Sequence, residues 1–96
     1  MTTTTRSKTP ATAASIKVAR KLVAWARNAE HEAQGDEHAS SYRFEQAAQW
    51  VAALPEASYQ RLLTSLYLLT HKAPTAEWKQ TISDTIAALR VERAMP

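Results

Sequence analysis

The sequence contains no cysteine, which excludes disulfide bonds, zinc sites built on thiolates and a cysteine nucleophile. It has a single glycine, Gly35, among 96 residues. Because tight turns between strands favour glycine, a sheet protein is not expected. Alanine, leucine, glutamine, glutamate and arginine, which favour helices, are frequent instead. The composition therefore predicts an all-α protein.

Long apolar runs are also missing. None approaches the roughly 18–20 residues that a membrane-spanning helix needs, and the sequence lacks the pattern of a secretory signal peptide. We therefore expect a cytoplasmic protein. The 96 residues suit one domain, and a core of that size is compatible with a homodimer.

Acidic residues are absent from the first part of the chain. Residues 1–27 contain no aspartate or glutamate, whereas residues 28–96 contain nine acids and six cations. The modest net charge of +3 thus hides a strong asymmetry. The six cations of the first part are Arg6, Lys8, Lys17, Arg20, Lys21 and Arg27. A positive segment of this kind attracts phosphate backbones and other polyanions.

The organisation of the chain follows from its apolar periodicity. Residues 1–9, with four consecutive threonines and two cations, have no apolar face and predict a flexible basic arm. Amphipathic segments predict four helices, at about 10–34, 37–53, 56–72 and 75–93. Their short connections predict a single-domain antiparallel bundle of about four helices.

Capping residues mark the expected helix ends. Thr9 with Pro10 after it, or else Ser15, is the expected start of the first helix, and Gly35 suits its end. Asp36, Pro55 and Thr75 are the expected starts of the next three helices.

Each predicted helix has one apolar stripe. The 56–72 segment is the most apolar, so we expect it to be the central helix, with Leu68 pointing away from its stripe. The expected core residues are Val18, Ala19, Leu22, Ala26, Ala29 and Ala33, then Phe44, Ala47, Ala48, Val51 and Leu54, then Tyr59, Leu62, Leu63, Leu66 and Leu69, and finally Trp78, Ile82, Ile86 and Leu89.

The charges of the first helix oppose its dipole. Lys17, Arg20 and Lys21 lie in its N-terminal half, where cations are unfavourable, and Glu30 and Glu32 lie near its C-terminal end. Helix stability alone favours the reverse order, so the pattern points to a binding surface. The competing interpretation is a solvated face beside a solubilising tail.

Three further patterns suggest other sites. Residues 31–38, with two histidines and three carboxylates, are a weak metal hypothesis, because the spacing matches no metal motif. Residues 45–66 loosely resemble a helix-turn-helix, in which Gln60 and Arg61 would read bases. An acid-free, Ser/Thr-rich start is also typical of a transit peptide or an interfacial helix, although its alanine-rich stripe argues against strong membrane binding.

The aromatic residues offer two interpretations. Tryptophan and tyrosine at the edge of a helix can stack bases or anchor a protein interface, and more often they line the edge of a core. The set is Trp25, Tyr42, Phe44, Trp50, Tyr59, Tyr67 and Trp78.

No catalytic arrangement is apparent, so we expect a protein that is not an enzyme and has no cofactor or metal. The main hypothesis is a nucleic-acid-associated regulator or small subunit of a nucleoprotein complex, binding DNA or RNA. Its predicted site comprises Arg6, Lys8, Lys17, Arg20, Lys21, Arg27, Gln60 and Arg61. The alternative is an adaptor or inhibitor whose basic and aromatic surface docks on an acidic protein. A membrane is not an expected partner.

Overall fold

The computed structural model of the protein describes residues 10–32 and 39–95, which form four helices and no strand. The helices are α1 (Ala13–Glu32), α2 (Ala39–Ala52), α3 (Glu56–His71) and α4 (Ala76–Ala94). The predicted all-α class is confirmed. The predicted arm, the Gly35–Asp36 turn and most of the 31–38 cluster lie outside the described residues.

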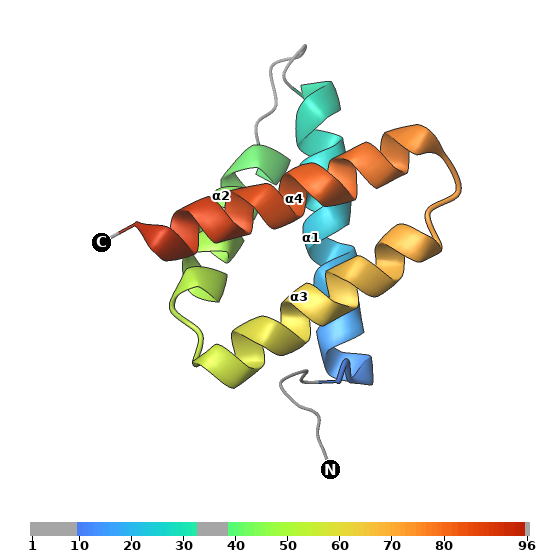
Figure 1. Ribbon diagram of the computed structural model, residues 1–96. Coiled ribbons are helices and arrows are strands. Elements are labelled where there is room, and N and C mark those ends of the chain that lie inside the picture. The colour runs from blue at the N-terminus through green and yellow to red at the C-terminus, as the bar shows by residue number, and fades with distance from the viewer. Residues whose placement is uncertain (1–9, 33–38, 96) are drawn as a thin grey trace.

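The helices form two layers (Figure 1). In this view α3 and α4 lie in front, and α1 passes behind both and crosses them steeply. Helix α2 lies beside α1 and behind α4. Helices α1 and α4 each contact all three other helices, whereas α2 and α3 have the weakest mutual contact although they are consecutive. The helix with the most extensive contacts is α1, and not α3, the segment expected to be central.

The start of α1 differs from the sequence expectation. Its cap is Thr12, whose Oγ1 accepts a hydrogen bond from the Ser15 N–H at 3.1 Å. Ser15 Oγ in return accepts one from the Thr12 N–H at 2.8 Å. This reciprocal pair is a capping box in which serine replaces the usual glutamate. Ser15 thus lies three residues inside the cap, and not at the cap position itself.

The other described helix starts agree with expectation. Helix α3 begins after Pro55, which stands at its N-cap. Helix α4 begins after Thr75, whose side chain accepts a hydrogen bond from the Trp78 N–H. The backbone of each of these two residues is extended and not helical, as is usual at the N-cap position.

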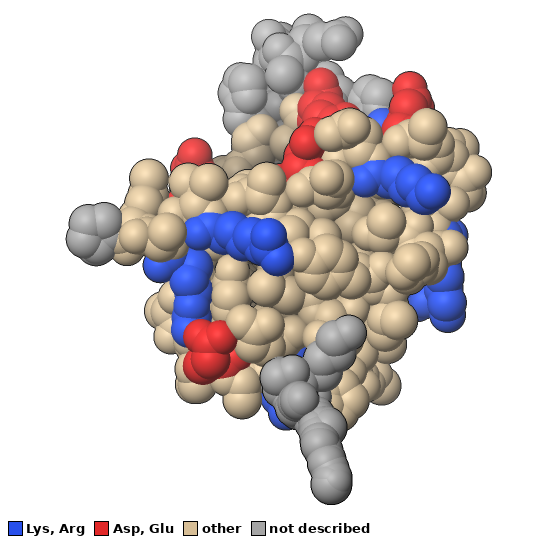
Figure 2. Space-filling model, viewed as in Figure 1, with Lys and Arg blue, Asp and Glu red and all other residues tan. Residues whose placement is uncertain are grey.

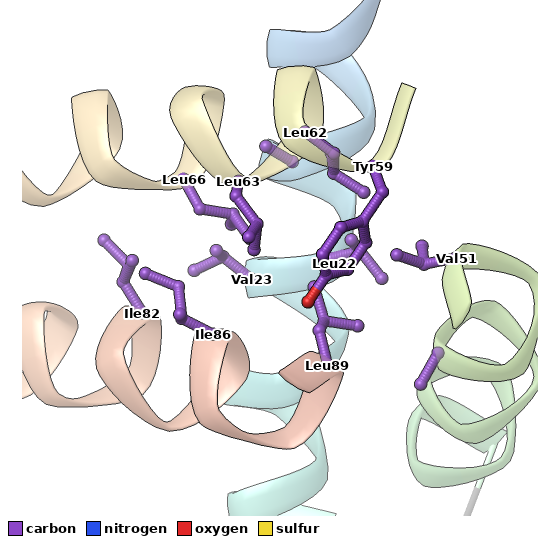
Figure 3. Close-up of a cluster of buried hydrophobic side chains, with 12 residues drawn as sticks. Leu22, Val23, Val51, Tyr59, Leu62, Leu63, Leu66, Ile82, Ile86 and Leu89 are labelled. Carbon is purple, nitrogen blue, oxygen red and sulfur yellow. The ribbon is translucent and has the colours of Figure 1, made fainter. Parts of the chain in front are cut away.

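The core lies where the two layers meet, and Figure 3 shows side chains from all four helices pointing into it. Most predicted core residues are buried or half-buried, and Leu68 is exposed as expected. Val23, which was not among the predicted core residues, is also part of the core. The buried apolar residues are Ala19, Leu22, Val23, Ala48, Val51, Tyr59, Leu62, Leu63, Leu66, Ile82, Ile86 and Leu89.

Three buried polar residues were not expected. Ser65, Thr81 and Thr85 are each at most 1% exposed. Each hydroxyl donates to a backbone carbonyl one turn earlier in its own helix, for example Thr85 Oγ1 to the Thr81 oxygen at 2.8 Å. Because each of these three hydroxyls is satisfied within its own helix, its burial leaves it paired.

Candidate functional site

The cations of α1 divide into two groups in the structure. Lys17, Arg20 and Lys21 are exposed and form no ion pair within the described residues. They gather around Val18, where they line a shallow depression. These three residues remain the predicted site residues with the most accessible positive charge. Arg6 and Lys8 lie outside the described residues.

Arg27 is turned toward α4. Its guanidinium lies 2.9 Å from the Glu77 carboxylate and 3.7 Å from that of Glu30. It also lies 5.3 Å from the centre of the Trp78 ring. These contacts satisfy its charge and join α1 to α4. Arg27 is therefore separated from the other cations that the sequence grouped with it.

Gln60 and Arg61, the predicted base readers, have different surroundings. Gln60 Nε2 donates to the Glu56 carboxylate at 2.7 Å. Arg61 is half-buried, and its Nε has no hydrogen-bond partner in the described part of the chain. Since α2 and α3 hardly contact each other, they lack the mutual packing that would support the helix-turn-helix interpretation.

An apolar groove of about 440 Å³ lies on the surface between α1 and α2, two helices that pack against each other. Its walls carry three aromatic side chains, Trp25 from α1 and Tyr42 and Trp50 from α2. Tyr42 is 63% exposed and Trp50 is 56% exposed, so neither serves mainly as a core residue. Lys21 lines the groove from α1 and Arg43 from α2, and none of the described residues that line it is acidic.

A second groove of about 280 Å³ continues the first one toward α3. The two share Val18 and Trp50, and the second also contains Arg61. Among the residues described at this second groove, too, there is no carboxylate. We call the combined surface the aromatic face, defined by Val18, Lys21, Trp25, Tyr42, Arg43, Trp50 and Arg61.

Cations of three helices therefore line one surface, to which none of the described acidic residues contributes. The face formed by α3 and α4 is different, because Figure 2 shows cationic and acidic side chains interspersed there. Two of the ion pairs also join helices elsewhere: Arg27 with Glu77 and Arg93 with Glu56. Within the described residues, Lys21, Arg43 and Arg61 of the aromatic face form no ion pair.

Sequence reasoning missed Arg43 and missed the meeting of the three rings. One local signal was present: positions 43 and 50 share a side of a helix because they are seven residues, or two turns, apart. Nothing in the sequence showed that this side of α2 lies against Val18, Lys21 and Trp25 of α1. That juxtaposition depends on how the helices pack.

The titratable groups with shifted pKa lie away from this face. Hydrogen bonds from Gln60 and Arg93 lower the pKa of Glu56, and burial raises the pKa of Tyr59. Both belong to the corner where α2, α3 and α4 meet. In the described part of the chain, no three histidine or acidic side chains gather closely enough to hold a metal ion. None of its helices is long and apolar enough to cross a membrane.

Comparison with family models, curated proteins and solved structures finds no match to this chain. Its function must therefore be inferred from the groups that its surface presents. Those groups are the exposed cations of α1 and the aromatic face beside them.

Proposed function

We propose that the protein is a non-enzymatic binding protein that associates with nucleic acid through α1 and the aromatic face. The observation that carries this proposal is that Lys21, Arg43 and Arg61, from three different helices, line two connected grooves in which no described residue supplies a carboxylate. Lys17 and Arg20 extend the same positive surface along α1. A phosphate backbone requires this kind of extended, uncompensated positive charge.

The basic arm supports the same function. Thr12, the cap of α1, lines the second groove, so the described part of the chain begins beside the aromatic face. Arg6 and Lys8 precede this point by only a few residues. In this proposal they add phosphate contacts beyond those of the helices, mainly without sequence preference.

Binding titrations with charge-reversed variants test the proposal. Labelled duplex and single-stranded oligonucleotides are titrated with the wild type and with a Lys17→Glu/Lys21→Glu variant at two or more salt concentrations. If both lysines contact phosphates, the double variant binds more weakly, and the slope of log affinity against log salt falls by about two.

The matched control is Lys72→Glu/Lys79→Glu. It changes the net charge equally but alters exposed lysines outside the aromatic face. We expect it to retain most of the wild-type affinity and slope. Equal weakening by the two double variants, or no binding of the wild type at low salt, would refute the proposal. Circular dichroism verifies that all variants remain helical.

A second candidate function is that of an adaptor or inhibitor for an acidic protein. It is favoured by the α1–α2 groove, which is lined almost wholly by apolar surface, as in sites that receive an amphipathic helix. Affinity purification distinguishes the two functions. A stoichiometric protein partner that survives nuclease treatment and high salt favours the adaptor, because phosphate contacts weaken steeply with salt.

A further inference from the structure

The aromatic side chains of the α1–α2 groove are the least explained part of the surface. Scattered exposed apolar residues are ordinary, but a contiguous group of them in a concavity marks a binding site. Tyr42 and Trp50 lie eight residues apart on one side of α2, about 12 Å along the helix axis. Trp25 faces them from α1 in the same groove. A ligand in this groove therefore meets several aromatic rings in succession.

The cations are arranged around these rings. The Lys21 ammonium lies 6.0 Å from the centre of the Trp25 ring. Arg43 stands on the opposite wall, and Arg61 lies beyond Trp50 in the second groove. Aromatic rings within a cationic rim are the combination that single-stranded nucleic acid requires, because each nucleotide presents a flat base and a phosphate.

A duplex fits the same groove less well. Its bases are stacked on one another and expose only their edges, so a duplex offers phosphates to the rim but no free base face to the rings. The half-buried apolar residues of the groove, such as Ala47, would make no contact with a base face of a duplex. A single strand can satisfy both the rim and the rings.

We infer that the α1–α2 groove takes unpaired nucleobases, so that the protein prefers single-stranded nucleic acid to duplex. Bases stack on Trp50 and Tyr42, and the flanking phosphates lie against Lys21 and Arg43. This inference rests on the proposed nucleic-acid function and names its substrate class. It also assigns to the aromatic residues a contribution separate from that of the α1 cations.

The test measures binding of a short oligothymidine and of a mixed-sequence duplex of equal length by fluorescence anisotropy. We expect tighter binding of the single strand. Trp50→Ala should weaken single-strand binding about fivefold or more and change duplex binding by less than about twofold. Trp50→Phe keeps a ring and should recover most of the loss. Tyr42→Ala, which alters a second exposed ring, should weaken single-strand binding in the same selective way.

Tyr67→Ala is the matched control, because Tyr67 is an exposed aromatic residue of α3 outside both grooves. It should leave binding of the oligothymidine unchanged. In the wild type, the single strand should also quench tryptophan emission, as expected for stacking on Trp50. Thermal unfolding of every variant distinguishes a lost contact from a lost fold.

The outcomes separate this inference from the proposed function. Equal affinity for both oligonucleotides, with no effect of Trp50→Ala or Tyr42→Ala, overturns the base-stacking inference but leaves the phosphate-binding function in place. Failure to bind either oligonucleotide at low salt overturns both. The inference also fails if a designed amphipathic helix of glutamate and leucine binds the groove in a Trp50-dependent manner while oligothymidine does not.

Discussion

Arg93 of α4 joins three helices at one corner of the molecule. Its guanidinium donates to the carbonyl of Ala52, the last residue of α2, and to that of Leu54 in the connection to α3. It pairs with Glu56 at 3.0 Å and lies 4.3 Å from the centre of the Tyr59 ring. The contacts span 34 to 41 positions of sequence, which explains why local patterns did not reveal them.

Glu56 gives this corner a pH dependence. Hydrogen bonds from Gln60 and Arg93 stabilise the charged carboxylate, so its pKa in the folded protein lies below its ordinary value of 4.5. A lowered pKa contributes stability that is present above the unfolded pKa and is lost as the pH falls through the folded pKa.

We therefore predict that Glu56→Gln makes stability less sensitive to acid. In the wild type, the contribution of Glu56 to the free energy of unfolding is lost progressively as the pH falls below 4.5. The variant lacks this contribution, so its free energy of unfolding falls less steeply over the same pH range. Urea unfolding from about pH 7 to about pH 3 measures this free energy. The control is Glu45→Gln, which removes an exposed carboxylate that forms no ion pair with the described residues. It should keep the wild-type dependence of the free energy of unfolding on pH.

At the scale of helices, the N-terminus of α1 is fixed twice. Thr12 and Ser15 cap each other's backbone N–H groups. The Ser15 hydroxyl also lies 2.8 Å from that of Ser65, a fully buried residue of α3. The cap thus sets both where α1 begins and how it lies against α3. Because Thr12 and Ser15 both line the second groove, the cap also shapes the aromatic face.

We predict that Thr12→Ala lowers the free energy of unfolding by about 1 kcal/mol, the usual effect of losing a helix cap. Thr12→Ser keeps the hydroxyl and should have nearly the wild-type free energy of unfolding. Urea or thermal unfolding measures the difference. A Thr12→Ala protein as stable as the wild type would show that the cap contributes little and that packing alone fixes this end of α1.

At the scale of the whole molecule, the fold depends on one core shared by all four helices (Figure 3). Leu66 of α3 is fully buried in it, whereas Leu68, two residues later on the same helix, is 43% exposed. A core of this size has little reserve, because small domains bury a smaller fraction of their surface.

Leu66→Ala should therefore lower the free energy of unfolding by about 3 kcal/mol or more, since it removes buried methyl groups and leaves a cavity. Leu68→Ala makes the same chemical change on the exposed side and should cost less than about 1 kcal/mol. The two variants are compared by urea unfolding monitored by circular dichroism. Similar losses in both would indicate that the Leu68 face is also covered, for example by a second copy of the chain.

The amino-acid sequence by itself determined the class of fold and most of the buried positions. Apolar residues at helical spacing, one glycine and well-placed prolines leave few alternatives to helices. The pattern also separated Leu66 from Leu68, because burial follows the face of the helix. The positive charge of the first 27 residues was visible in the same way.

Only the tertiary structure decided which of these charges act together. It turned Arg27 toward Glu77 and Trp78, and it brought Arg43 and Arg61 to the surface that Lys21 occupies. Periodicity tells which residues share a side of one helix, but not which sides of different helices meet. The candidate site lies between helices, so the physical reason for its composition is the packing of α1 against α2 and α3.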